Sequence, residues 1–269
     1  MINLKYPIML VHGLGFHDNL FFKNWGRIPD ALRKEGCRVF FGNQDGNATV
    51  EENGKALYKR IRSILKKTGA EKMNVIAHSK GGMEMRYAIS TLGADKYVAS
   101  LTTVATPHNG SKTMDLIMRS PKWLIGAAAF CYDTLSYFIG DKHPDSYKAL
   151  ESFTTKYTKR FNKENPDSPN VYYQSYAFLL RNQLGEPLEF LPYTLVKLIE
   201  GDNDGFMTPE SAKWGDFRGV YTGAGLRGIS HIDVLDFFRK PFTDVKGEGV
   251  SDIVDFYTGL VKELSEMGY

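Results

Sequence analysis

The sequence predicts an α/β fold in which a mostly parallel central sheet is flanked by helices and carries a helical cap insertion. Strand-like apolar runs alternate with helix-like segments four times over residues 7–105, which is the pattern of a doubly wound parallel sheet. From Ser111 to about Asn170 the pattern changes to helices without strands, which indicates an insertion. We therefore expect a core formed by residues 1–110 and 171–269, and a cap formed by residues 111–170 with a contribution from residues 180–200.

Length and charge limit the classes of protein to which the chain can belong. Its 269 residues suit one large domain, and Lys plus Arg (34) nearly balance Asp plus Glu (31), giving a net charge of +3. This balance argues against nucleic acid or an anionic membrane as a partner. The longest apolar run, Trp123 to Tyr132, is about half of the roughly 20 residues that a transmembrane helix needs, so we expect no transmembrane segment.

The first residues and the two cysteines bear on the cellular compartment. The segment MINLKYPIML leads directly into a strand and lacks a signal-peptide pattern. We expect a cytoplasmic protein, or a secreted one if a signal peptide has been removed. Cys37 and Cys131 both lie in apolar stretches, which favours two buried free thiols over a disulfide.

The first strand should be Pro7 to Val11, a continuous apolar run typical of a strand buried on both faces of a parallel sheet. It ends in His12-Gly13-Leu14-Gly15, where two glycines let the backbone turn with its N–H groups exposed. The backbone amide of Leu14 is therefore a candidate oxyanion donor, although a plain glycine turn is the alternative. A helix over Asn24–Glu35, a strand over Cys37–Gly42 and an amphipathic helix over Thr49–Lys67 should follow.

The segment MNVIAHSKGG, residues 73–82, has the pattern of a nucleophile elbow. An apolar run stops at His78-Ser79-Lys80, and a helix-like segment begins after it. The small residues Ala77 and Gly81 flank Ser79 two positions away on either side, as such a tight turn requires. The turn would expose the Ser79 hydroxyl at the positive end of the helix and make the Lys80 amide a second oxyanion donor. The alternative is an ordinary turn in which Ser79 caps the helix.

Three candidate loops should meet at one edge of the sheet. Val98 to Ala105 predicts another strand, which ends at Thr106-Pro107-His108-Asn109-Gly110. Because ligands collect at the carboxyl ends of parallel strands, this loop should lie beside Leu14 and Ser79. The expected position of all three loops at one edge is stronger evidence for a functional site there than any single motif.

The insertion is unusually apolar and should cover the active edge. Its large apolar side chains are Met114, Leu116, Ile117, Met118, Trp123, Leu124, Ile125, Phe130, Leu135, Tyr137 and Phe138. We interpret the segment as a cap whose inner face lines a pocket for acyl chains and can lift, with Met114, Trp123 and Phe130 as candidate substrate contacts. Simple helical core is the alternative.

The remaining elements close the predicted sheet. Val171 to Phe178 should be a strand, Gly201 to Gly205 a turn-rich loop at a strand end, and Gly219 to Ala224 the last strand. Residues 228–233 should form a loop, and Val250 to Glu266 a closing amphipathic helix.

A serine becomes a good nucleophile when a histidine takes its proton and a carboxylate orients that histidine. The chain supplies Ser79, Asp204 and His231 in that order, with the cap filling the long first gap. His231 is the one histidine that follows a plausible acid loop, and a structural histidine is the alternative. Asp202 is the rival acid.

The chain resembles the bacterial triacylglycerol lipases and carboxylesterases of the α/β-hydrolase superfamily. The matching motifs are PIMLVHGLG, NVIAHSKGG, TPHNGS, NDGFMTPESAKWG and SHID, which run from Pro7 to Asp233. The resemblance implies the α/β-hydrolase fold, with Ser79 as nucleophile, Asp204 as acid and His231 as base. It also implies an oxyanion hole made by the amides of Leu14 and Lys80, and it favours Asp204 over Asp202.

Three departures from the family pattern matter. Ala77 replaces the first glycine of the elbow and is still small. Lys80 stands where uncharged residues are common, and a side chain near the pocket would favour anionic or polar esters. Many of these lipases hold a structural calcium ion near the catalytic histidine, and Asp233 matches one of its ligands. No clear aspartate partner stands shortly before Asp204, so the sequence offers one calcium ligand without completing a calcium site. The alternative role for Asp233 is to cap a helix.

These observations predict a serine hydrolase of carboxylic esters that needs no cofactor for catalysis. The expected substrate is an ester or lipid with medium to long acyl chains, as for a triacylglycerol lipase, met at a transient lipid–water interface. The alternatives are a small-ester carboxylesterase and an acyltransferase, in which an alcohol replaces water. A hypothesis of another class is a noncatalytic binding protein with the same fold, against which the intact Ser79, Asp204 and His231 argue.

Overall fold

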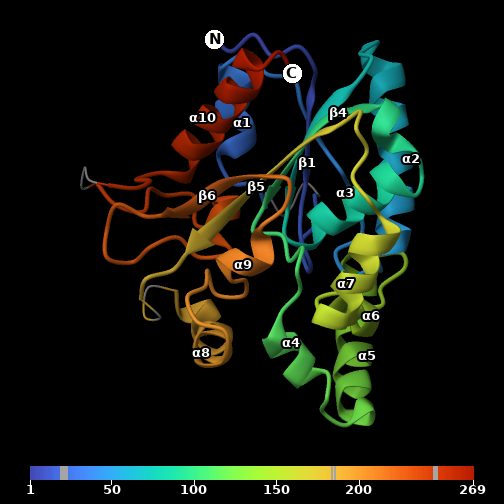
Figure 1. The fold of residues 1–269 in the computed structure, drawn as a ribbon, viewed down its shortest axis with the longest axis vertical. Coiled ribbons are helices and arrows are strands. Elements are labelled where there is room, and N and C mark those ends of the chain that lie inside the picture. Colours follow the sequence, from blue (N-terminus) through green and yellow to red (C-terminus); the bar gives the residue numbers. More distant parts are fainter. Residues whose placement is uncertain (19–23, 183, 185, 245–247) are drawn as a thin grey trace.

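Six parallel strands form one central sheet in the order β2-β1-β3-β4-β5-β6 (Figure 1). The computed structural model describes residues 1–18, 24–182, 184, 186–244 and 248–269. The strands are β1 (Ile8–Val11), β2 (Val39–Phe41), β3 (Met73–His78), β4 (Val98–Val104), β5 (Tyr172–Leu179) and β6 (Asp216–Thr222). The predicted doubly wound parallel sheet is therefore confirmed.

Helices cover both faces of the sheet, which explains why its central strands are buried along their whole length. Figure 1 shows α1 (Ile28–Lys34) and α10 (Ile253–Glu266) on one side of the sheet, and α2 (Val50–Thr68) and α3 (Lys80–Ser90) on the other. Neighbouring residues of β1 pack in opposite directions, Leu10 with the first pair of helices and Met9 with the second. Every residue of β1, β3 and β4 is buried.

Local signals set the limits of the flanking helices. Thr49 caps α2 by accepting a hydrogen bond from the Glu52 amide, and Gly69 ends it in the left-handed conformation at φ 70°. The first helix starts at Ile28, later than expected, with Pro29 in its first turn, where a missing N–H costs nothing. The short helices η1 (Ala94–Lys96), α9 (Pro209–Ala212) and η4 (Asp233–Leu235) complete the core.

The segment between β4 and β5 is helical, as predicted. It contains α4 (Lys112–Ile117), α5 (Lys122–Ile139), α6 (Ser146–Glu151) and α7 (Thr155–Glu164). Between β5 and β6 lie η3 (Pro187–Glu189) and α8 (Phe190–Ile199), and Figure 1 shows α4, α5 and α8 at the end of the molecule opposite both termini. Phe153 and Phe161 form a core cluster with Val50 and Met83, so α7 packs against the core rather than extending beyond it. The boundary of the cap at residues 111–170 stays a prediction.

Helix α5 turns small side chains toward the rest of the protein and large apolar side chains toward solvent. Its buried residues are Ala129 and Ser136, whereas most of its large apolar side chains face solvent. Cys131 is exposed on this helix, so the expectation that it is buried is wrong, while Cys37 is buried as expected and both thiols are free. None of the helices in the described ranges is both long and apolar enough to cross a lipid bilayer.

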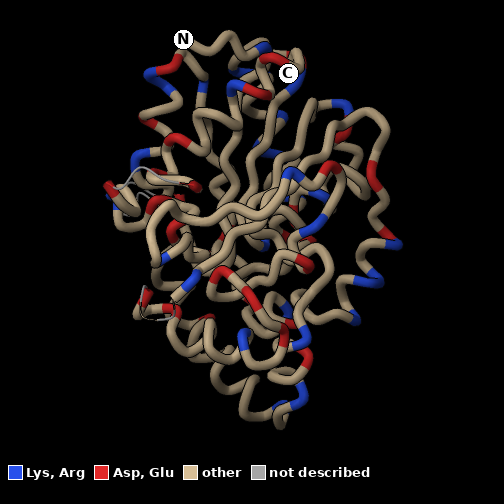
Figure 2. The backbone as a smooth tube through the Cα atoms, turned by 60° about the vertical axis from the view of Figure 1, so that its left-hand side comes forward, with Lys and Arg blue, Asp and Glu red and all other residues tan. Residues whose placement is uncertain are grey.

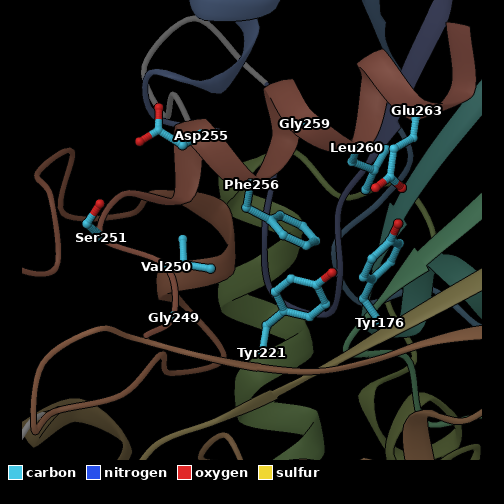
Figure 3. Close-up of a pocket in the computed structure, with 10 residues that line it drawn as sticks. All are labelled: Tyr176, Tyr221, Gly249, Val250, Ser251, Asp255, Phe256, Gly259, Leu260 and Glu263. Atoms are coloured by element: carbon cyan, nitrogen blue, oxygen red, sulfur yellow. The ribbon is translucent and has the colours of Figure 1, made fainter. Parts of the chain in front are cut away.

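The far edge of the sheet is irregular. Strand β6 begins at Asp216, earlier than expected, and its register against β5 shifts between Ser175 and Ala177. A hollow of about 290 Å³ lies between this edge and α10, and Figure 3 shows Tyr176, Tyr221 and Phe256 along it. Figure 2 shows charges of both signs interspersed along the chain, consistent with the small net charge.

Candidate active site

Ser79 stands in a strained turn between β3 and α3. Its φ of 52° and ψ of −128° lie in a region that residues with side chains rarely adopt. The Ser79 amide donates to the Val104 carbonyl at 3.0 Å, and the Thr106 hydroxyl donates to the Ser79 carbonyl at 2.8 Å. A Cβ at Gly81 would lie 2.5 Å from the His12 carbonyl oxygen, so the turn leaves no room for a side chain there. Ser79 occupies the N-cap position of α3, yet its hydroxyl makes no capping hydrogen bond.

His231 and Asp204 form a hydrogen-bonded pair. His231 Nδ1 lies 2.8 Å from Asp204 Oδ2, and the His231 amide donates to the Asp204 carbonyl at 2.7 Å. The second carboxylate oxygen, Oδ1, accepts from the amides of Phe206 and Met207 at 3.0 and 2.7 Å. The carboxylate is thus fixed on both oxygens, and it selects the tautomer in which His231 Nε2 is free to accept a proton.

The rival acid lies elsewhere. Asp202 is exposed and forms an ion pair with Lys197 on the surface. The structure therefore brings Asp204, and not Asp202, to the histidine.

Ser79 and His231 line a single cavity of about 540 Å³. The other lining residues are mostly apolar. They come from the loop after β1, from α4, α5 and α8, from α6 and the turn after it, and from the loop after Asp204. They include Phe16, Met114, Ile117, Tyr132, Leu150, Phe153, Leu195, Val196, Phe206 and Met207. A cavity of this size and character suits a small or medium-sized apolar ligand. Met114 lies where the sequence predicts.

Trp123 and Phe130 do not line this cavity, so their assignment as substrate contacts is wrong for this structure. Their side chains are 74% and 73% exposed. Because α5 turns its small residues Ala129 and Ser136 inward, the large aromatic side chains point to solvent, and Tyr132 is the residue of α5 that lines the cavity. The sequence could not distinguish these faces, since apolar residues lie all around the helix.

The two candidate oxyanion donors flank the nucleophile. Gly13 presses against Ser79 so closely that a Cβ on Gly13 would lie 2.7 Å from the serine Cβ, and the next residue, Leu14, lines the cavity. Lys80 is the first residue of α3, and the first N–H groups of a helix have no partner within it. The Tyr132 hydroxyl closes over the same loop, 3.0 Å from the position of a Cβ on Gly15.

The side chain of Lys80 is fully buried away from the cavity, which corrects the expectation that it selects polar esters. Its Nζ donates to the Ala48 carbonyl at 2.8 Å and pairs with Glu84, which also accepts from Asn53 at 2.8 Å. Lys80 therefore ties α3 to the segment before α2, while Glu84 joins α3 to α2 through Asn53, and Lys80 does not line the cavity.

A buried carboxyl group that the sequence did not predict lies beside the triad. Glu189 is 1% exposed and accepts from the amides of Ile232 and His231 at 2.9 and 3.3 Å. Burial, reinforced by the negative charge of Asp204, raises the pKa of Glu189 to about 9. At neutral pH Glu189 is therefore a neutral acceptor. No pattern in the sequence points to Glu189, because it meets the triad from the segment before α8.

The imidazole ring of His78 packs against that of His231. Its ring centroid lies 4.5 Å from that of His231, and its Nε2 lies 3.2 Å from the His231 carbonyl oxygen. Burial and the proximity of His231 hold the pKa of His78 well below its usual range. His78 therefore stays neutral and adds no positive charge next to the catalytic base.

Asp233, the candidate calcium ligand, forms an ion pair with Arg227. Its Oδ2 accepts from Arg227 Nη1 at 2.5 Å and from the Ser230 amide at 2.9 Å. Among the described residues, no group of three or more His, Cys, Asp or Glu side chains could hold a metal ion. The residues around Asp233 therefore do not fit the calcium site that the resemblance implies.

Comparison with known proteins adds independent observations. A family model described as alpha/beta hydrolase fold matches residues 6–190. The chain is 31% identical to Triacylglycerol lipase 2 of Saccharomyces cerevisiae, over 91% of this chain and 74% of that protein. It is 29% identical to a triacylglycerol lipase of Pseudomonas fragi, over 89% of this chain and 90% of that protein. With a triacylglycerol lipase of Pseudarthrobacter phenanthrenivorans the identity is 32%, but the match covers 61% of this chain and about half (55%) of that protein.

Solved structures show the same fold. The mature form of Bacillus licheniformis lipase BlEst2 superimposes with a TM-score of 0.65 at 22% identity, covering 88% of this chain and 89% of that one. The metagenomic carboxyl esterase MGS0156 superimposes with a TM-score of 0.70 at 16% identity, covering 98% of this chain and 77% of that one. At these identities the likeness is one of fold alone.

Proposed function

The chain belongs to the alpha/beta hydrolase family, and on that premise we propose that it is a lipase that cleaves carboxylic esters through an acyl-enzyme on Ser79. One observation carries the proposal: Ser79 lines the same apolar cavity as His231, whose Nδ1 is held 2.8 Å from Asp204. A serine, a histidine with a fixed tautomer and an apolar space beside them are what acyl transfer from an ester requires.

The geometry supports the following sequence of steps. His231 Nε2 takes the proton of Ser79 Oγ while Oγ bonds to the ester carbonyl carbon, and Asp204 stabilises the imidazolium that forms. The carbonyl oxygen becomes negative and is held by the amides of Leu14 and Lys80, which flank Ser79. The imidazolium gives its proton to the leaving alcohol. Water, deprotonated by the same histidine, then cleaves the acyl-enzyme and releases the acid.

The cavity points to an acyl chain as the group that is bound. Its walls combine the apolar side chains of Met114, Ile117 and Leu195 with few polar atoms apart from those of the triad. Burying a methylene group is worth about 0.8 kcal/mol, so each additional carbon that fits the cavity should improve binding. Esters of medium to long acyl chains should therefore gain the most binding free energy from this cavity.

A lipid surface is the proposed setting of the reaction. Exposed apolar side chains gather on the helices that roof the cavity: Trp123, Phe130, Tyr137 and Phe138 on α5, and Leu191 and Leu198 on α8. Several large exposed apolar side chains on helices that line an active-site cavity favour an interaction site there. We propose that these helices contact the lipid phase and act as a lid over Ser79.

The test is hydrolysis of p-nitrophenyl esters from acetyl to palmitoyl, run beside Ser79→Ala and with a fluorophosphonate label. We expect labelling and turnover in the wild type, loss of both in the variant, and a preference for medium or long chains. A preference for acetyl or butyryl esters would make the protein a small-ester carboxylesterase. If the folded wild type neither labels nor turns over any ester, the proposed function is wrong and a noncatalytic binding role replaces it.

A further inference from the structure

The loop that carries the catalytic base is held by the segment before α8. We call residues 227–236 the histidine loop and residues 186–189 the clamp segment. The clamp segment reaches the loop with two buried carboxyl groups: Glu189 accepts from the amides of His231 and Ile232, and Glu186 pairs with Arg227. Both glutamates are 1% exposed.

Arg227 joins two buried carboxylates. Its Nη2 donates to Glu186 Oε2 at 2.7 Å, and its Nη1 donates to Asp233 Oδ2 at 2.5 Å. Asp233 is 4% exposed, and the side chain of Arg227 is 26% exposed. Two carboxylates this deeply buried need a positive charge, because burying an unpaired charge is costly.

The guanidinium group of Arg227 can neutralise both carboxylates, and it occupies the place that a metal ion would need. Its planar fork can donate to both carboxylates at once, with a fixed direction for each bond. Asp233 Oδ2 accepts from Arg227 and also from the Ser230 amide, so a divalent ion at this oxygen would have to displace Arg227. The Ser230 amide is adjacent to His231, so the bridge acts directly on the backbone that carries the base.

We propose that Arg227 is a positioning residue that takes the place of a structural cation, by bridging Glu186 and Asp233 and so fixing the backbone of His231. The histidine loop therefore needs no calcium ion. This inference rests on the proposed function, because what the bridge positions is the base of the ester hydrolase.

The first test concerns metal ions and needs no substrate. Calcium chloride is titrated into the EDTA-treated wild type by calorimetry, and the melting temperature is measured with EDTA and with calcium chloride. We expect no heat of binding and the same melting temperature in both solutions. A melting temperature that falls in EDTA and recovers with calcium would overturn the proposal.

The second test compares Arg227→Ala with Arg218→Ala. Arg218 is a matched control, since it also bridges two carboxylates, Asp216 and Glu263, at 3.3 Å each, but at the far edge of the sheet, where Glu263 lines the hollow (Figure 3). The readouts are kcat and KM on a soluble ester, the rate of fluorophosphonate labelling and the pH profile of kcat/KM.

We expect Arg227→Ala to lower kcat and the labelling rate by on the order of 10- to 100-fold with little change in KM, because a misplaced base slows the chemical step. The acid limb of the pH profile of kcat/KM should also move, because it reports the essential base of the free enzyme. Arg218→Ala should leave all three unchanged. Equal effects of the two substitutions, or a change in KM alone, would show that Arg227 does not position the base.

Two conservative variants keep the test decisive if Arg227→Ala does not fold. Arg227→Lys keeps the charge but not the planar guanidinium group. Glu186→Gln removes the negative charge at one end of the bridge, while Asp233 keeps its arginine. Both should lie between the wild type and Arg227→Ala in labelling rate. Wild-type activity in either variant would overturn the proposal. A wild type that binds no calcium but also fails to label would instead contradict the proposed function and leave the metal result standing.

Discussion

Asp202 and Asp204 stand two residues apart in the same loop, and their environments differ completely. Asp204 is buried, and its two oxygens are occupied by His231 and by two backbone amides. Asp202 is solvent-exposed and pairs with Lys197. A carboxylate that orients a catalytic histidine must be fixed in this way, whereas a surface ion pair contributes little.

We therefore predict opposite results for the two amide variants. Asp204→Asn should lower kcat by roughly 10³- to 10⁴-fold, because the amide cannot keep His231 in the productive tautomer. Asp202→Asn, the matched control, should retain wild-type kcat. Steady-state hydrolysis of a soluble ester measures both, and a large loss in Asp202→Asn would reverse the assignment of the acid.

Glu189 gives a prediction about stability and pH. Its pKa is raised in the folded protein to about 9, above its value of about 4.3 in an unfolded chain. A raised pKa means that the folded state holds the proton more tightly, so this contribution to stability is fully present below the unfolded value and is lost as the pH rises through about 9.

Glu189→Gln should remove that dependence, because the amide does not ionise. Its Oε1 can still accept from the Ile232 amide, whereas its Nε2 cannot accept from the His231 amide, a loss that is the same at every pH. We expect the stability of the wild type relative to the variant to fall by a few kcal/mol between pH 5 and pH 9. Urea denaturation of both proteins at several pH values measures this difference. Parallel curves for the two proteins would contradict a neutral Glu189.

The chemistry-bearing residues were predictable because each follows a recognisable strand or turn. Ser79 is preceded by a buried strand and followed by a helix, and Asp204 and His231 lie in turn-rich loops in the right order. Glu189 and Arg227 were not predictable. Their function depends on contacts between segments that are distant in the sequence, and an isolated glutamate or arginine is typical of any surface.

Helix α5 is the element for which hydropathy gave the wrong inner face. Its inward side consists of Ala129, Tyr132 and Ser136, and Ser136 accepts from Asn47 at 2.8 Å. Immediately after the helix, Asp141 accepts from the amides of Gly46 and Asn47 at 2.7 and 3.0 Å. Polar contacts with the core, rather than apolar burial, therefore set how this helix is turned.

We predict that the outward face of α5 acts at the lipid surface. Replacing Trp123, Phe130 and Phe138 together by serine should lower hydrolysis of an emulsified triglyceride by about tenfold or more, since each aromatic side chain removed from water contributes about 1.5–3 kcal/mol. Hydrolysis of a soluble short ester should be retained because none of the three lines the cavity.

The control for this experiment is Val220→Ser, an exposed apolar residue on β6. It should affect neither assay. Equal losses on the emulsion and on the soluble ester in the triple variant would show that α5 supports catalysis and not interfacial binding.

At the scale of the whole molecule, the sheet brings distant segments to one edge. Arg27, at the start of α1, donates to Asp236 at the end of the histidine loop and to Asp252 at the start of α10. The histidine loop is thus held by the clamp segment on one side and by two core helices on the other. That the sheet is parallel was predictable from the alternation of strand-like and helix-like segments, but these cross-links were not.

The central strands should determine stability without taking part in chemistry. Leu10 in β1 is fully buried, and Leu10→Ala should lower the free energy of unfolding by about 2–5 kcal/mol. Leu198→Ala, at a position that is 80% exposed, should change it by less than about 0.5 kcal/mol. Guanidinium denaturation measures both. If Leu10→Ala also lowers the activity per folded molecule, the sheet is less rigid than its packing indicates.

The two thiols differ in a way that makes helix α5 observable in solution. Cys131 is exposed on α5, whereas Cys37 is buried in the core, where burial raises the pKa of its thiol. A maleimide dye at neutral pH should therefore react at Cys131 first, in the wild-type sequence. The fluorescence of such a dye would report, without any engineered cysteine, whether α5 enters a nonpolar medium when lipid vesicles are added.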